Sequence, residues 1–263
     1  MTAASQITMN ILVLKLILAP LIIGSASLAG RRWGAAVSGW LVGLPLTSGP
    51  VVFFLALSHD KAFVFDAIRG TLSGGFSLVA YTLTYAWISK RSNWAASILA
   101  STVVFAGMTM LMQNIVFPFI PLFFYILIAI LTGLWLMPGH IPIEITTPPG
   151  KWDIPARILI GTSFILLITG IAPCIGARLT GLMTTIPLYI SILTIFAHRH
   201  QGHAGANSVL RGLILGLFSF TGFYLVLGLL IERSSLGLAF GAAILAALIV
   251  QGTSLLILNV THK

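Results

Sequence analysis

The stretch Gly39-Trp-Leu-Val-Gly-Leu-Pro45-Leu-Thr-Ser-Gly-Pro50 interrupts an apolar run that extends from residue 35 to residue 57. At about 1.5 Å per residue, this run is long enough to cross a bilayer as a helix. Pro45 and Pro50 each lack a backbone donor and clash with the carbonyl four residues earlier, which predicts a break near mid-membrane. Thr47 and Ser48 place hydroxyls beside that break. Membrane helices tolerate such breaks where protein or a water-lined cavity satisfies the freed groups, and many transporters build their sites in this way.

A second copy of this pattern lies 142 residues further along the chain. Gly39 corresponds to Gly181 and Pro45 to Pro187, and the register continues without a gap on both sides. Chance similarity between apolar segments would match Leu, Ile and Val, whereas these matches are mostly Gly, Pro, Arg and Ser. The further pairs are Lys15/Arg157, Gly34/Gly176, Arg69/Arg211, Gly70/Gly212, Gly74/Gly216, Phe76/Phe218, Ser77/Ser219, Arg91/Arg233 and Ser92/Ser234. We interpret the pattern as an internal duplication.

The composition predicts a polytopic α-helical membrane protein. Of the 263 residues, 58% are hydrophobic and only 7% are charged, and the mean hydropathy is +1.06. The apolar runs are about 20 residues long, which indicates helices rather than the alternating strands of a barrel. The net charge of +9 comes from basic residues at the ends of these runs, so we expect membrane lipids and not nucleic acid as partners. The single cysteine, Cys174, excludes an internal disulfide.

Nine transmembrane helices are predicted, arranged as two inverted four-helix repeats joined by a connecting helix. The first repeat covers residues 1–112 and the second covers 156–263, with a connecting helix and a Pro/Gly-rich loop at 113–155. The first run is kept as a span rather than a cleaved signal, because residues 1–10 carry no basic residue. The odd connecting span starts the second repeat on the opposite side of the membrane, which inverts it. The predicted spans are 8–29, 35–57, 63–87, 94–112, 116–137, 156–174, 178–197, 207–231 and 236–258.

Basic residues in the loops predict the orientation. An N-terminus outside and a C-terminus in the cytoplasm place nine Lys and Arg inside and five outside, which fits the excess of positive charge on cytoplasmic loops. The inner set is Arg31, Arg32, Lys90, Arg91, Lys151, Arg157, Arg199, Arg211 and Lys263, and the outer set is Lys15, Lys61, Arg69, Arg178 and Arg233.

Each half resembles the small four-span GlpM-type (DUF3147-like) bacterial membrane proteins. In these proteins a Gly-Leu pair opens the second span, a proline follows six residues after the glycine, and a basic residue begins the third span. Gly181-Leu182, Pro187 and Arg211 match this pattern closely, and Gly39, Pro45 and Arg69 form the other copy. The resemblance implies a four-span unit in the bacterial inner membrane and a context in exopolysaccharide (alginate) production. It supplies no catalytic or binding residues.

Two interpretations of the interrupted helices remain open. The prolines could make packing kinks, which membrane helices tolerate. Alternatively, each helix could be discontinuous and line a substrate path between the second and seventh spans. The candidate path residues are Pro45, Thr47, Ser48 and Pro50 in the first half and Thr184, Thr185, Pro187 and Ser191 in the second.

Three basic residues are further candidates. Arg69 and Arg211 each precede a Gly-x-x-x-Gly pair, which we expect to serve close helix packing. Their guanidinium groups could extend to the lipid headgroups or bind an anion, and Asp66 could pair with Arg69 at i, i+3. Lys15 lies about eight residues into its run, where a charge usually faces protein or water. Arg157 begins its span, so we expect an interfacial role there.

No enzyme, metal or cofactor chemistry is predicted. The turn His198-Arg-His200-Gln-Gly-His203 has neither a carboxylate nor a cysteine nearby in sequence, so a solvated basic loop is favoured over a metal site. The chain has no catalytic triad spacing, HExxH, phosphate-binding loop or CxxC. None of the five acidic residues lies in the middle of a predicted span, which argues against proton-coupled export of cations.

The sequence therefore predicts a small transporter or permease for a neutral or anionic solute that works by alternating access. The alternative is a non-transporting membrane accessory factor, for instance in exopolysaccharide or envelope synthesis. A homodimer is compatible with either function.

Overall fold

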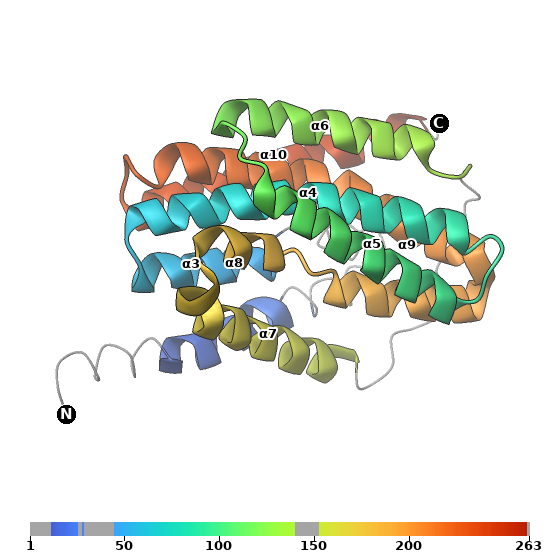
Figure 1. Ribbon diagram of the computed structural model, residues 1–263, viewed down its shortest axis with the longest axis horizontal. Helices are drawn as coiled ribbons and strands as arrows, with labels where there is room; N and C mark the ends of the chain where they lie inside the picture. Colours follow the sequence, from blue (N-terminus) through green and yellow to red (C-terminus); the bar gives the residue numbers. More distant parts are fainter. Residues whose placement is uncertain (1–11, 26–27, 29–44, 140–152, 262–263) are drawn as a thin grey trace.

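The computed structural model describes residues 12–25, 28, 45–139 and 153–261, and no strand occurs in these ranges (Figure 1). The predicted start of the second span, including Gly39, and the loop from 140 to 152 lie outside the described residues, as does the side chain of Arg157. The helices are Leu12–Ser25, α3 (Ser48–Ser58), α4 (Lys61–Ile88), α5 (Trp94–Asn114), α6 (Phe119–Leu136), α7 (Asp153–Ile175), α8 (Ala177–Met183), α9 (Leu188–Leu230) and α10 (Leu236–Thr261).

The protein is an α-helical membrane protein. Five helices in the described part are long and apolar enough to cross a bilayer. They include α5 and α6, whose bounds lie within a few residues of the predicted spans 94–112 and 116–137. Large apolar side chains point outward from these helices, such as Trp135 of α6 with 81% of its surface exposed. Exposed side chains of this kind suit contact with lipid.

The seventh and eighth predicted spans meet at a much shorter turn than the sequence suggests. Helical residues continue from Leu188 to Leu230, and only Gly202 departs from helical geometry, with φ of 67° and ψ of −162°. Glycine adopts this positive φ without steric cost. The predicted loop over His198–His203 is therefore largely helical, and α9 consists of two helical parts that meet at Gly202.

The core forms around α4, α6 and the second part of α9. Phe119, at the start of α6, packs against Phe65 of α4 and lies close to Gly228 of α9. Near the other end of α6, Gly133 lies beside Val79 and Ile214. From the start of α6 to its end, the contacts on α4 move from Phe65 to Val79, whereas those on α9 move from Gly228 back to Ile214. Helix α4 and the second part of α9 therefore run antiparallel beneath α6 (Figure 1).

Helix α8 and the first part of α9 follow α4 in the same direction. Successive polar contacts pair residues whose numbers rise together on both segments: Thr71 with Thr184, Tyr81 with Ser191, and Tyr85 with His198. A second apolar cluster joins helix Leu12–Ser25, α3 and α7 through the buried side chains of Ala19, Ile23, Phe54, Leu55, Ile165 and Ile168. The two interrupted segments thus have different neighbours.

Candidate functional site

The interruption predicted at Pro187 is present. Helix α8 ends at Met183 and α9 begins at Leu188, with Pro187 as its N-cap. The turn satisfies its own backbone donors, since the amides of Thr185 and Ile186 bond the carbonyls three residues earlier at 3.2 and 3.1 Å. Such tight turns commonly end a helix. The segment Thr184–Pro187, called the second break below, therefore interrupts the helix without leaving the amides of Thr185 and Ile186 unpaired.

Helix α4 packs tightly against the second break. A Cβ atom on Gly181 would overlap the carbonyl oxygen of Ala67, and one on Gly74 would overlap the side chain of Thr185. Gly70 is equally close to the backbone of Arg178. The predicted packing role of the Gly70/Gly74 pair is confirmed, because only glycine permits this approach. At Gly212, by contrast, a Cβ would meet nothing within 4 Å in the described part of the chain.

A seam of paired polar side chains, defined here as the hydroxyl seam, leads away from the second break along α4. The hydroxyls of Thr71 and Thr184 are 3.2 Å apart, and those of Tyr81 and Ser191 are 2.7 Å apart. The Tyr85 hydroxyl then lies 3.2 Å from Nδ1 of His198. Thr184 and Thr185 are buried and also donate to carbonyls of their own turn. These groups satisfy one another's hydrogen bonds, and α4 packs closely against the same segment. We therefore call the second break sealed below.

The segment Pro45–Thr47, called the first break below, lies just before α3, and the residues that precede it lie outside the described ranges. The amide of Gly49 donates to the carbonyl of Pro45 at 2.8 Å, which begins the helix. Pro50 occupies the first turn of α3, where a missing N–H leaves no bond unmade. The expectation of two helix-breaking prolines is thus wrong for Pro50, which helps to start a helix instead.

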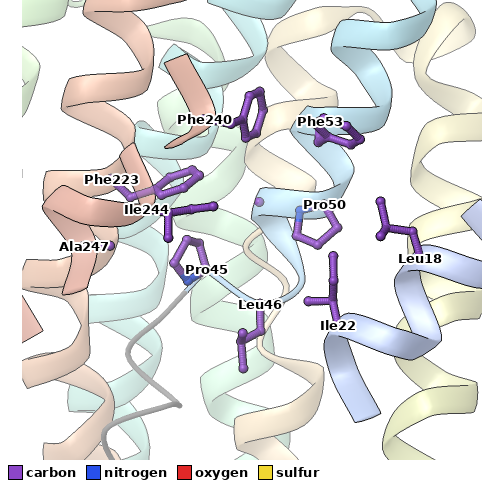
Figure 2. Close-up of a pocket in the computed structure, with 11 residues that line it drawn as sticks. Leu18, Ile22, Pro45, Leu46, Pro50, Phe53, Phe223, Phe240, Ile244 and Ala247 are labelled. Carbon is purple, nitrogen blue, oxygen red and sulfur yellow. The ribbon is translucent and has the colours of Figure 1, made fainter. Parts of the chain in front are cut away.

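An apolar cavity of about 340 Å³ adjoins the first break (Figure 2). Side chains from helix Leu12–Ser25, the first break, α3, α9 and α10 converge on it. The rings of Phe53 and Phe223 both make edge contacts with Phe240, with centroid distances of 5.2 and 6.2 Å. The lining residues are Leu18, Ile22, Pro45, Leu46, Gly49, Pro50, Phe53, Phe223, Phe240, Ile244 and Ala247.

Only some of the predicted path residues meet at this cavity. Pro45 and Pro50 line it, whereas Thr47 and Ser48 lie next to it in sequence and do not. Thr184, Thr185, Pro187 and Ser191 do not line it either. The predicted path between the second and seventh spans therefore does not coincide with the cavity, because α4 fills the space beside the second break. Phe223 and Phe240 were missed, since nothing in their sequence pattern separates them from ordinary core aromatics.

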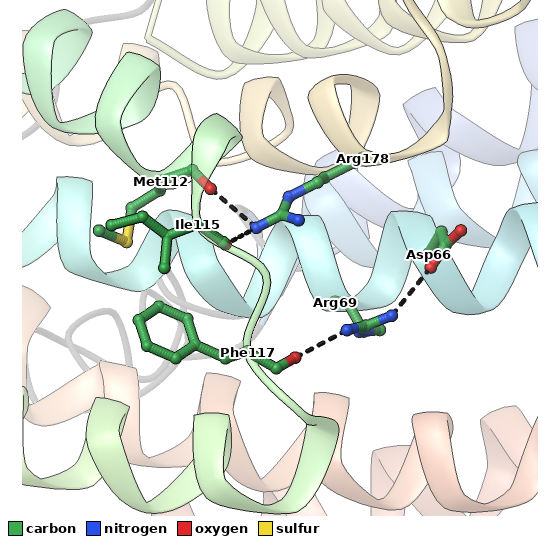
Figure 3. A network of polar contacts seen from close by, with 6 residues as sticks. All are labelled: Asp66, Arg69, Met112, Ile115, Phe117 and Arg178. Carbon is green, nitrogen blue, oxygen red and sulfur yellow. Dashed lines mark hydrogen bonds and ion pairs between the residues drawn. The ribbon is translucent and has the colours of Figure 1, made fainter.

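Two arginines hold the connection between α5 and α6 (Figure 3). Arg69 forms the predicted ion pair with Asp66, at 3.3 Å, and donates to the carbonyl of Phe117 at 2.7 Å. Arg178 donates to the carbonyls of Met112, at 2.8 Å, and Ile115. A cation on the carbonyls at the end of a helix is favourable for the helix dipole. Both arginines thus have structural bonds, and sequence reasoning did not single out Arg178.

The other basic candidates lie apart from the cavity lining. Nζ of Lys15 donates to the Thr169 hydroxyl of α7 at 3.0 Å and lies 5.8 Å from the centroid of the Phe54 ring. This agrees with the expectation that a lysine at this depth faces protein. Arg211 is half-buried in α9. No group of three or more His, Cys, Asp or Glu side chains in the described ranges could hold a metal ion.

Comparison with known protein families, curated protein sequences and solved structures finds no match to this chain.

Proposed function

We propose that the chain is a small transporter or permease of the bacterial inner membrane, built from two inverted repeats around interrupted helices. The observation that carries the proposal is the cavity at the first break, set against the sealed second break. An interrupted helix beside a cavity is a common way to build a transport site. The proposed solute is neutral, because the described lining of the cavity holds no charged side chain.

Helix boundaries support the inverted repeats. Helix α4 ends at Ile88 and α9 ends at Leu230, which lies one 142-residue shift later. The same shift relates the first residues of α5 and α10, Trp94 and Leu236. Asp60, the N-cap of α4, corresponds to Gly202, where α9 bends.

Contacts between helices also recur under the shift. Tyr81 of the first repeat contacts Ser191 of the second, and their counterparts Phe223 and Gly49 also lie together, so both contacts join the two repeats. Ser77 accepts a bond from Thr109 of α5, and its counterpart Ser219 donates to the carbonyl of Ala247 of α10. The antiparallel course of α4 and the second part of α9 is the arrangement that inversion requires. These pairs support nine spans with opposite orientation of the halves.

The proposed mechanism is alternating access. Inverted halves can exchange conformations, so that an opening at one half closes while its counterpart opens. In the described conformation the cavity adjoins the first break, and the Tyr81–Ser191 bond closes the corresponding place in the other half. The exchanged state would separate Tyr81 from Ser191. We propose that the N-terminus lies outside and the C-terminus in the cytoplasm, as the loop charges predict.

Thiol labelling tests the proposal without a known substrate. In a Cys174→Ser background, Leu46→Cys would report on the cavity and Ser191→Cys on the sealed break. We expect a small membrane-permeant maleimide to modify Leu46→Cys, because its surroundings are apolar. We expect a small water-soluble reagent to modify Ser191→Cys over time, when the exchanged state separates it from Tyr81. Ala243→Cys, at a fully buried position in α10, provides the unreactive control. If neither test cysteine reacts in folded, correctly inserted protein, the transport proposal fails.

The second candidate function is an accessory factor for exopolysaccharide or envelope synthesis. The apolar character of all described residues that line the cavity and the tight packing of the second break favour it, because a water-filled path needs polar walls. Comparison of metabolites in deletion and overexpressing cells distinguishes the two functions. A transporter changes the distribution of its solute across the membrane, whereas an accessory factor changes the polymer product alone.

A further inference from the structure

The cavity at the first break is continuous with the lipid-facing surface. Ile244 of α10 lines the cavity and still has 49% of its surface exposed. Leu245 beside it is 62% exposed, and on the facing helix Leu21, next to the lining residue Ile22, is 61% exposed. Large apolar side chains exposed to this extent on apolar helices face hydrocarbon. The cavity can therefore be reached from within the bilayer.

We expect this cavity to be neither empty nor filled with water. Protein interiors hold few voids larger than a water molecule, because the atoms around a void lose their dispersion contacts. A volume of about 340 Å³ falls within the range of pockets that hold small molecules. Water needs two or more polar partners to occupy a cavity, and the lining contributed by described residues consists of aliphatic, proline, glycine and phenylalanine residues. Hydrocarbon satisfies both conditions.

Buried polar residues next to the lining residues in sequence do not alter this conclusion. Ser48 and Tyr224 are buried neighbours in sequence of the lining residues Gly49 and Phe223, but neither lines the cavity. A polar solute placed there would lose its bonds to water and gain none from the lining. The chemistry of the lining thus selects an apolar chain.

We propose that the cavity binds one acyl chain of a membrane phospholipid, which enters past Ile244 and lies against Pro45, Pro50 and the edges of Phe53 and Phe223. The proposal rests on the proposed function only in taking this cavity as the working site. It specifies the ligand as an amphiphile whose hydrocarbon part is held by the protein while its headgroup remains outside the described lining.

Photo-crosslinking to a labelled lipid tests the inference. The full chain is reconstituted in phosphatidylcholine and phosphatidylglycerol vesicles that contain a phosphatidylcholine with a diazirine near the end of one acyl chain. After illumination, mass spectrometry maps the modified residues. We expect modification of Leu46 and Phe53, in addition to the background on exposed residues such as Trp135.

A pair of adjacent variants supplies the control. Ile244→Trp narrows the cavity, whereas Leu245→Trp changes an exposed residue that does not line it. We expect Ile244→Trp to lose the modification at Leu46 and Phe53 and to keep that at Trp135. Leu245→Trp should keep both. Size-exclusion profiles that match the parent protein show that the variants are folded.

Several results would overturn the inference. Modification at Trp135 without any at Leu46 or Phe53 would mean that no acyl chain enters. Equal losses in the two Trp variants would mean that the modified residues are not reached through an opening beside Ile244, which overturns the proposed site. Disulfide-linked dimers of an Ile244→Cys, Cys174→Ser protein would instead indicate that a second copy covers the opening. Because the readout is binding, crosslinking without solute movement would refute the transporter and leave the acyl-chain site in place.

Discussion

The two breaks carry similar sequence signals and have different surroundings. Beside the second break, Gly70 and Gly181 bring α4 and α8 into backbone contact, and Gly74 lets the Thr185 side chain pack against α4. Hydroxyl pairs complete this contact. At the first break, Phe223 and Gly49 occupy the positions that correspond to Tyr81 and Ser191, and an apolar cavity adjoins them. Pro187 caps α9 at the second break, and Pro45 lies just before α3 at the first. The neighbouring helix decides whether the interruption is sealed or opens onto a cavity.

The largest expected effect comes from Gly181→Ala, which disrupts the sealed break. The added Cβ would overlap the carbonyl oxygen of Ala67, and backbone cannot yield as a side chain can. We expect a loss of about 3 kcal/mol or more in the free energy of unfolding. Thermal unfolding in detergent measures it. Gly212→Ala is the matched control, with open space around its Cβ, and should change stability by at most about 1 kcal/mol. Equal effects in the two variants would contradict the tight packing of α4 on α8.

Arg178→Ala should have the next largest effect, because Arg178 ties the start of α8 to the connection between α5 and α6. Its guanidinium donates to the carbonyls of Met112 and Ile115, and bonds from charged groups contribute about 1.5–3 kcal/mol each. We expect a loss of about 2 kcal/mol in unfolding free energy on this basis. Arg91→Ala, at an exposed residue of the α4–α5 turn, should change stability by less than about 0.5 kcal/mol. A null result for Arg178→Ala would show that the sealed break does not depend on this anchor.

The double variant Tyr81→Phe, Ser191→Gly would replace the Tyr81–Ser191 hydrogen bond by a Phe/Gly pair like Phe223 and Gly49 at the first break. The hydroxyl bond of 2.7 Å is lost, and bonds of this kind inside membranes contribute about 0.6 kcal/mol on average. A double-mutant cycle with Tyr81→Phe and Ser191→Ala should therefore give a coupling of about 0.6–1.7 kcal/mol. Tyr125→Phe, on the exposed face of α6, is the control for loss of a phenolic hydroxyl. A coupling of zero would mean that the two hydroxyls do not hold the break closed.

Local signals in the sequence predicted the local features of this contrast. The break at Pro187, the Asp66–Arg69 ion pair and the bounds of α5 each follow from residues close together in the chain. Features that depend on distant partners could not be predicted. The role of Pro50 depends on where α3 starts, and the cavity depends on Phe223 and Phe240, which lie far along the chain. The predicted turn over His198–His203 was also too long, since the polar residues there remain helical up to Gly202. One of them, His198, has its partner far away in the chain, at Tyr85 of α4.

The smallest expected effect is that of Gly49→Ala, and it gives the closest comparison of the two breaks. An added Cβ would lie 3.7 Å from both Phe223 Cζ and Pro45 Cγ, which is ordinary van der Waals contact. Alanine is also favoured over glycine in a helix by about 1 kcal/mol, so the variant should be as stable as the parent or slightly more stable. The methyl group would also reduce the free volume of the cavity at its inner wall. Measurement of the unfolding free energy would show whether position 49 tolerates alanine. Gly74→Ala, whose Cβ would overlap the Thr185 side chain, should be strongly destabilised in the same assay. If both variants lost stability equally, the first break would be packed as tightly as the second, and the cavity could not be the feature that distinguishes them.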